Sequence, residues 1–149
     1  KKIEKKVFDP EYGWEIKNSD GNVYNNESNS SYGDTFTTGD IIGVYLDLDN
    51  NKIYWAKNGT VQNSGTGVSI TDPASTNTGN YFFCVTDNAS GDSVTWEANF
   101  GNPSFAISSG NADAKGYGNF EYDPSSGTFD GASKDFLALC TKNLGSSGG

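Results

Sequence analysis

The sequence contains no histidine and no arginine, and only two of its 149 residues are cysteine. Without histidine, the chain lacks the commonest general base, the commonest zinc ligand and the usual member of a catalytic triad. Without arginine, it lacks the planar groups that bind phosphate and guanine bidentately. These absences argue against most hydrolases and against a nucleic-acid partner, and we expect no metal and no other cofactor.

Positive charge is also scarce, since the formal net charge is −9. Such an acidic chain is poorly suited to an anionic membrane surface, and no apolar run approaches the roughly 20 residues that cross a bilayer. No apolar segment follows the basic residues 1–6, as it would in a signal peptide. We therefore expect a soluble chain without membrane insertion, exported by a route such as cell lysis.

Length and composition predict one domain with a core of few, bulky residues. A chain of this length fits a single compact domain. Only 34% of its residues are hydrophobic but 13% are aromatic, so large rings must supply much of the buried area. We assign residues 1–144 to this domain and residues 145–149, which are only glycine and serine, to a flexible tail.

Alternation of apolar and polar residues predicts a β-hairpin in residues 40–57. Its first strand has an apolar face at every second position, made of Ile42, Val44, Leu46 and Leu48. Residues 47–52 supply turn chemistry, residues 53–57 begin a second strand, and Asn58-Gly59 is typical of a tight turn. Nowhere does a helical stripe last for three turns.

Three later apolar runs predict further strands. Residues 81–85 are apolar at both odd and even positions, which predicts a central strand. Residues 94–100 alternate between apolar and polar, which predicts a half-buried strand, and residues 136–140 are predicted to close the sheet. Residues 106–134 are less regular, but their spaced aromatics predict a loop pinned onto the sheets. Those aromatics are Tyr117, Phe120, Tyr122 and Phe129. The fold class is therefore all-β.

The motifs around the hairpin resemble those of the SPRY family. They are Tyr32-Gly33, residues 38–44 (TGDIIGV), residues 46–49 (LDLD), residues 57–59 (KNG), and Asn99-Phe100-Gly101 followed by Phe105. The resemblance implies an antiparallel β-sandwich of the concanavalin-like jelly-roll type, with a recognition surface made by loops at one end. We interpret Asp40, Asn58 and Asn99 as architectural rather than catalytic, because Gly39-Asp40 and Asn58-Gly59 suit turns.

The C-terminal residues are similar to the ending of SPRY-containing structural proteins of tailed phages. The similarity covers residues 116–127 and 136–144, which residues 128–135 separate as an insert. It implies a non-enzymatic module on the virion surface, outside the cell, of tail-fibre or capsid-decoration type. Its partners would be other virion proteins, copies of itself, or a glycan or protein of the host surface.

The front of the chain departs from the family pattern. SPRY domains usually begin with several strands, whereas only about eleven residues precede the first matching segment here. We therefore expect an N-terminally incomplete sandwich with exposed apolar edges, completed by another chain, a further segment or a neighbouring copy.

Candidate ligand-binding residues come from the expected rim loops, residues 18–31, 64–78 and 87–92. Tyr24, Tyr32 and Tyr81 lie in or beside these loops and have rings that stack on sugars or peptides, although each also suits packing. For Cys84 and Cys140, buried free thiols are the preferred interpretation and a disulfide between strands is the alternative.

A calcium loop is only imitated near the hairpin turn. Asp47, Asp49 and Asn51 match its first ligand positions, but Lys52 stands where glycine is required. Asn58 stands where a bidentate glutamate belongs, so an EF-hand is excluded.

Three alternatives remain open. Asp72, Asp87 and Asp92 are candidates for a looser calcium site. Glu97 is the best single candidate for a carboxylate of a polysaccharide-degrading enzyme, although alternation places it on the polar face. The third alternative is a cellular SPRY adaptor that binds a peptide.

Overall fold

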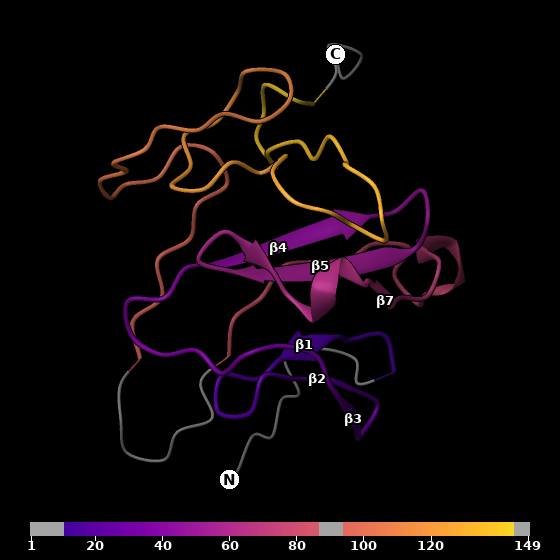
Figure 1. The fold of residues 1–149 in the computed structure, drawn as a ribbon. Helices are drawn as coiled ribbons and strands as arrows, with labels where there is room; N and C mark the ends of the chain where they lie inside the picture. The colour runs from indigo at the N-terminus through magenta and orange to yellow at the C-terminus, as the bar shows by residue number, and fades with distance from the viewer. Residues whose placement is uncertain (1–10, 87–93, 145–149) are drawn as a thin grey trace, which may run out of the picture.

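The structure is a computed structural model, and it describes residues 11–86 and 94–144. Within these ranges the regular structure consists of β-strands and two short 3-10 turns. Two antiparallel sheets lie one above the other, and the C-terminal segment covers the far side of the second sheet (Figure 1). The predicted antiparallel, all-β class is confirmed.

The first sheet consists of short, largely polar strands in the order β1 (Glu15–Ile16), β2 (Asn22–Asn25) and β3 (Ser28–Ser31). Asn26 and Glu27 form the turn between β2 and β3 with φ values of 46° and 63°, the positive pair of a two-residue hairpin. The prediction that residues 18–31 form a loop was wrong. A strand of sequence SNSS carries no apolar residue that would indicate it.

The second sheet contains the predicted hairpin, β4 (Ile42–Asp47) and β5 (Lys52–Lys57). β6 (Thr60–Val61) and β7 (Val68–Ser69) both pair with β5, so β5 is central and β4 is an edge strand. Asn58 and Gly59, with φ values of 48° and 79°, make the predicted turn from β5 to β6. The 3-10 turns η1 (Asn63–Gly65) and η2 (Pro73–Ser75) flank β7, and the predicted loop 64–78 contains β7, η2 and all of η1 but its first residue.

A core cluster joins the two sheets. Trp55 of β5 packs against Val23 of β2 and Tyr32, all three of them buried. The rings of Tyr32 and Trp55 meet edge to face with their centroids 5.3 Å apart. The backbone N–H of Trp55 also donates to the Tyr32 hydroxyl at 3.3 Å, so both of these buried polar groups have a hydrogen-bond partner.

The outer face of the second sheet is covered by residues of the insert 128–135. Phe129 is fully buried, with its ring centroid 5.2 Å from that of Tyr54 and 4.9 Å from that of Phe136. Asp130 accepts hydrogen bonds from the Tyr54 hydroxyl at 2.8 Å and the Gly67 N–H at 3.0 Å. The prediction that an aromatic residue pins this loop onto the sheets is confirmed at Phe129.

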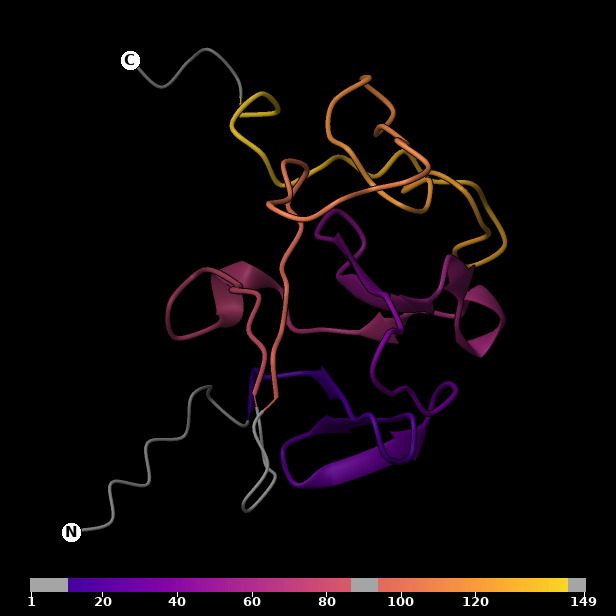
Figure 2. The same cartoon turned by 90° about the vertical axis from the view of Figure 1, so that its left-hand side faces the viewer.

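Three predicted strands were wrong. Residues 81–85, 94–100 and 136–140 are coil, as Figure 2 also shows, and the first two are exposed at nearly every position. Phe82 is 79% exposed and Trp96 is 47% exposed. An apolar run indicates a tendency to be buried, but a strand also needs a partner backbone, which the run itself does not specify.

Both cysteines are free thiols, as preferred above. Cys140 is half-buried, but Cys84 is exposed, so its predicted place in the core was wrong. Its segment, residues 81–85, is one of those that lie outside the sheets.

Candidate binding surface

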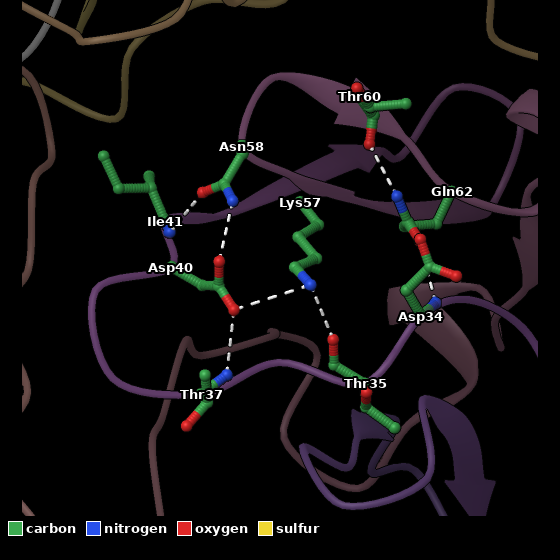
Figure 3. A network of polar contacts seen from close by, with 9 residues as sticks. All are labelled: Asp34, Thr35, Thr37, Asp40, Ile41, Lys57, Asn58, Thr60 and Gln62. Atoms are coloured by element: carbon green, nitrogen blue, oxygen red, sulfur yellow. Dashed lines mark hydrogen bonds and ion pairs between the residues drawn. The ribbon is translucent and has the colours of Figure 1, made fainter.

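A polar network fixes the loop before β4 to the turn after β5 (Figure 3). Asp40 accepts hydrogen bonds from the Thr37 N–H at 2.9 Å and from Asn58 Nδ2 at 2.7 Å. The Thr37 N–H, and then the Asn58 amide, lower the pKa of Asp40. Asn58 Oδ1 in turn accepts from the Ile41 N–H at 2.8 Å, and the Lys57 ammonium lies 3.5 Å from Asp40. These contacts join two motifs far apart in the sequence and agree with an architectural role for Asp40 and Asn58.

Gln62 makes a second link between the same loop and β6 (Figure 3). Its buried side chain accepts from the Asp34 N–H at 2.8 Å and donates to the Thr60 carbonyl at 2.9 Å. Sequence reasoning missed Gln62, because a glutamine beside a short strand carries no signal of burial.

Asp113 organises the C-terminal segment. Its buried carboxylate accepts hydrogen bonds from the Ala138 N–H at 2.9 Å, the Tyr117 N–H at 2.8 Å and Asn143 Nδ2 at 2.6 Å. Burial acts to raise the pKa of Asp113, but these donors outweigh it and lower the pKa to about 2. One side chain therefore holds two stretches of coil together.

An open apolar groove lies where β4, the segment after η2 and the C-terminal segment meet. Its volume of about 430 Å³ is within the range of ligand-binding clefts. Several lining side chains are well exposed, including Phe82 at 79% and Leu139 at 60%. The groove is lined by Leu46, Leu48, Pro73, Gly79, Asn80, Tyr81, Phe82, Phe83, Phe100 and Leu139.

Tyr81 anchors one end of this groove. Its hydroxyl donates to the Thr71 carbonyl at 2.6 Å, and its ring meets Trp14 edge to face with centroids 5.8 Å apart. Trp14 also packs on the core cluster of the two sheets. The Tyr81 end of the groove is therefore held by the sandwich, while Phe82 next to it extends into solvent.

The three tyrosines predicted to bind ligand do not form one site. Tyr32 is buried in the core, so its ring offers no surface to a ligand. Tyr24 lies on β2, donates to Asp20 at 2.7 Å and has the Lys17 ammonium 5.4 Å from its ring centroid. Tyr81 lines the groove, and a ligand-binding role for Tyr24 and Tyr81 stays a prediction.

The other groove residues were missed as surface residues. Phe82, Phe83 and Phe100 were expected in buried strands, and Leu139 in a closing strand. Their pattern is the same whether a run is buried or left open for a partner, so only the arrangement of the elements distinguishes the two.

The candidate acidic sites are dispersed. Asp47 pairs with Lys134 at 2.8 Å, and Asp72 accepts from the Ala74 N–H at the start of η2. Asp87 and Asp92 lie outside the described residues. Among the residues that are described, no group of three or more potential ligands is placed to hold a metal ion. The side chain of Glu97, the candidate carboxylate of an enzyme, is exposed to solvent.

Residues 11–86 and 94–144 include no helix that could span a membrane.

Two packed sheets, a covering C-terminal segment and an open apolar groove define a β-sandwich binding module. The SPRY domain family model matches residues 2–102, and the chain belongs to this family. Membership indicates a module for protein–protein interaction. No curated protein and no solved structure matches the chain.

Proposed function

We propose that the chain is a non-catalytic recognition module of a virion surface, of tail-fibre or capsid-decoration type, that binds another protein through its apolar groove. The observation that carries this proposal is the groove itself, because exposed apolar surface of this kind marks interaction sites on folded proteins. Candidate partners are a host-surface protein and a neighbouring virion protein.

The lining favours a protein partner over a glycan. Eight of the ten lining residues are apolar or glycine, and only Asn80 and Tyr81 carry polar side chains. A sugar would bury hydroxyl groups that need hydrogen bonds, whereas apolar side chains of a protein need none. The Tyr81 hydroxyl is already bonded to Thr71.

The lining also supports a non-catalytic role. None of its lining residues is aspartate, glutamate, lysine or cysteine, so it offers no carboxylate pair, and its one hydroxyl, that of Tyr81, is bonded to the Thr71 carbonyl. Incubation with host polysaccharides and a reducing-end assay tests this part of the proposal, and turnover would contradict it.

Labelling experiments test the recognition role. Immunogold electron microscopy should place the chain on intact particles, and the fluorescently labelled chain should bind host cells or particles lacking it. The double variant F82S/L139S, which makes the groove polar, should lose this binding at least tenfold. The matched variant L144S changes a side chain that is 67% exposed but outside the groove, and should bind normally.

The outcomes distinguish host recognition from a role in particle assembly. Binding to cells and competition with adsorption support host recognition, and binding to particles alone supports assembly. A chain absent from particles that binds neither would overturn the proposal.

A further inference from the structure

The edge of β4 carries backbone groups that point away from its sheet. The Asn58 N–H donates to the Ile41 carbonyl at 2.9 Å, which makes these two residues a hydrogen-bonded pair. Such pairs alternate along an antiparallel ladder, so Gly43 and Tyr45 bond to β5 while Val44, between them, faces the other way. The Trp55 carbonyl, opposite Val44, accordingly bonds to Gln62 on the far side.

The outward groups of Ile42, Val44 and Leu46 form an open edge. No hydrogen bond from another described segment reaches them. An edge with free N–H and C=O groups is a template for a further strand. The six residues of β4 offer a template about 20 Å long at about 3.3 Å per residue.

The groove continues from this edge. Leu46 of β4 and Leu48 of the turn that follows it both line the groove. The Val44 side chain is 39% exposed. A strand added beside β4 would place every second side chain on the groove side, because side chains alternate along a strand. Main-chain bonds and apolar pockets are thus offered together.

The charges around the groove select the partner. Asp49 follows Leu48, Asp72 precedes Pro73, and both are exposed acids. Lys134 is paired with Asp47, and Lys52 donates to the neutral Ser69 hydroxyl and keeps its charge, so the two acids outnumber the one unpaired lysine. The rim is therefore acidic, and a net charge of −9 disfavours a second copy as the occupant.

We propose that the β4 edge and the groove together bind an extended peptide of a partner protein that is apolar at alternate positions and carries basic residues between them. The peptide adds to the second sheet as a strand next to β4. This inference rests on the proposed function in taking the groove as the binding surface, and it specifies the kind of segment that the groove accepts.

Fluorescence anisotropy with three labelled peptides tests the proposal on the full chain. The first peptide alternates valine or phenylalanine with lysine over nine residues, and the second has glutamate in place of lysine. The third has the sequence of the first, but every second backbone nitrogen, on the edge that would bond to β4, carries a methyl group. The lysine peptide should bind at least tenfold more tightly than either of the others. Equal affinity for all three would overturn the proposal.

A matched pair of variants isolates the backbone contribution. V44P removes the outward N–H of Val44, which an edge strand tolerates because that N–H has no partner within the sheet. V44A also loses the valine side chain of residue 44 but keeps its backbone N–H. We expect V44P to weaken the lysine peptide at least fivefold relative to V44A, with near-ultraviolet circular dichroism showing that both fold.

L48S keeps the proposal testable if V44P fails to fold. It leaves the ladder and the charge intact but removes an apolar side chain from the groove beside β4, and should weaken binding of the lysine peptide at least fivefold. If V44P and L48S both bind the lysine peptide as well as the unaltered chain, strand addition is wrong. The recognition role would still stand if the F82S/L139S variant loses its binding to particles or cells.

Discussion

Asn58 meets two structural requirements with one residue. Its φ of 48° lies in the left-handed region, which asparagine tolerates better than most residues. Its amide group donates to Asp40 and accepts from the Ile41 N–H. The turn after β5 and the entry into β4 are therefore fixed by the same side chain.

Substituting Asn58 should separate these two contributions. N58G keeps the left-handed turn and loses both hydrogen bonds, so we expect the free energy of unfolding to fall by about 1–3 kcal/mol. N58A loses the same bonds and adds backbone strain, for about 1 kcal/mol more. Chemical denaturation measures both, and N29A, at an exposed position in β3, should cost under about 0.5 kcal/mol. Equal stability of N58G and the unaltered chain would contradict the role of the bonds.

Asp113 links the acid stability of the chain to one buried carboxylate. Its pKa of about 2 in the folded state lies below the ordinary value of 3.8. Between these values the unfolded chain binds more protons, so unfolding becomes easier as the pH falls. The stabilisation by Asp113 is complete above about pH 4 and is lost as the pH approaches 2.

D113N should remove this part of the pH dependence. The variant should be less stable at pH 7, because an amide nitrogen cannot accept the bonds from Ala138 and Asn143, and its stability should change less between pH 4 and pH 2. Urea denaturation at a series of pH values measures both effects. D49N, which changes an exposed carboxylate, is the control and should follow the unaltered chain. An identical slope for D113N would show that other carboxylates set the acid limit.

At the scale of elements, β5 is stabilised from both faces. Trp55 packs toward the first sheet, and Tyr54 packs against Phe129 of the insert. Each face thus depends on a segment distant in the sequence, and the insert contributes a fully buried ring rather than a surface loop.

F129A should therefore be far more destabilising than a similar change in the groove. Removing a fully buried phenylalanine costs about 3–5 kcal/mol, which can unfold a small domain. F82A removes the same atoms from a side chain that is 79% exposed and should cost under about 1 kcal/mol. Thermal unfolding distinguishes the two variants. A small loss in F129A would mean that the insert does not cover the sheet in solution.

The sequence indicated those elements whose signal is local. Alternation around Val44 and the pair Asn58-Gly59 defined the hairpin and its turns, because both are written in consecutive residues. Residues 81–85 and 94–100 carry an equally apolar pattern but remain outside the sheets, since pairing depends on which backbone lies alongside. Tyr81 was predicted both in a buried strand and beside a rim loop; the strand is absent, and the place of Tyr81 in the groove lining depends, like the exposure of Phe82, on how the segments are arranged.

For the whole molecule, strong negative charge and an open apolar groove act against each other. Like charges keep copies apart at neutral pH, while the groove favours association. The balance must shift as the carboxylates are protonated, because the sequence pI is near 4.2.

Self-association should therefore increase as the pH falls from 7 toward 4. Dynamic light scattering should show larger particles near pH 4, with circular dichroism confirming that the chain is still folded. The F82S/L139S variant has the same charge and should associate much less, while L144S should behave like the unaltered chain. Equal association of all three would mean that loss of charge alone is responsible.

The turn at Asn58 also bears on how the molecule ages. When glycine follows asparagine, the glycine nitrogen readily attacks the side-chain amide carbon and expels ammonia to form a succinimide, which water then opens to aspartate or isoaspartate. In the folded chain the Asn58 amide is held between Asp40 and Ile41, and is restrained from that reaction. Once deamidated, residue 58 would present a carboxylate to Asp40 where a 2.7 Å hydrogen bond now lies, and the two charges would repel. Each transient opening of this turn thus exposes Asn58 to irreversible deamidation, and the deamidated turn opens more easily.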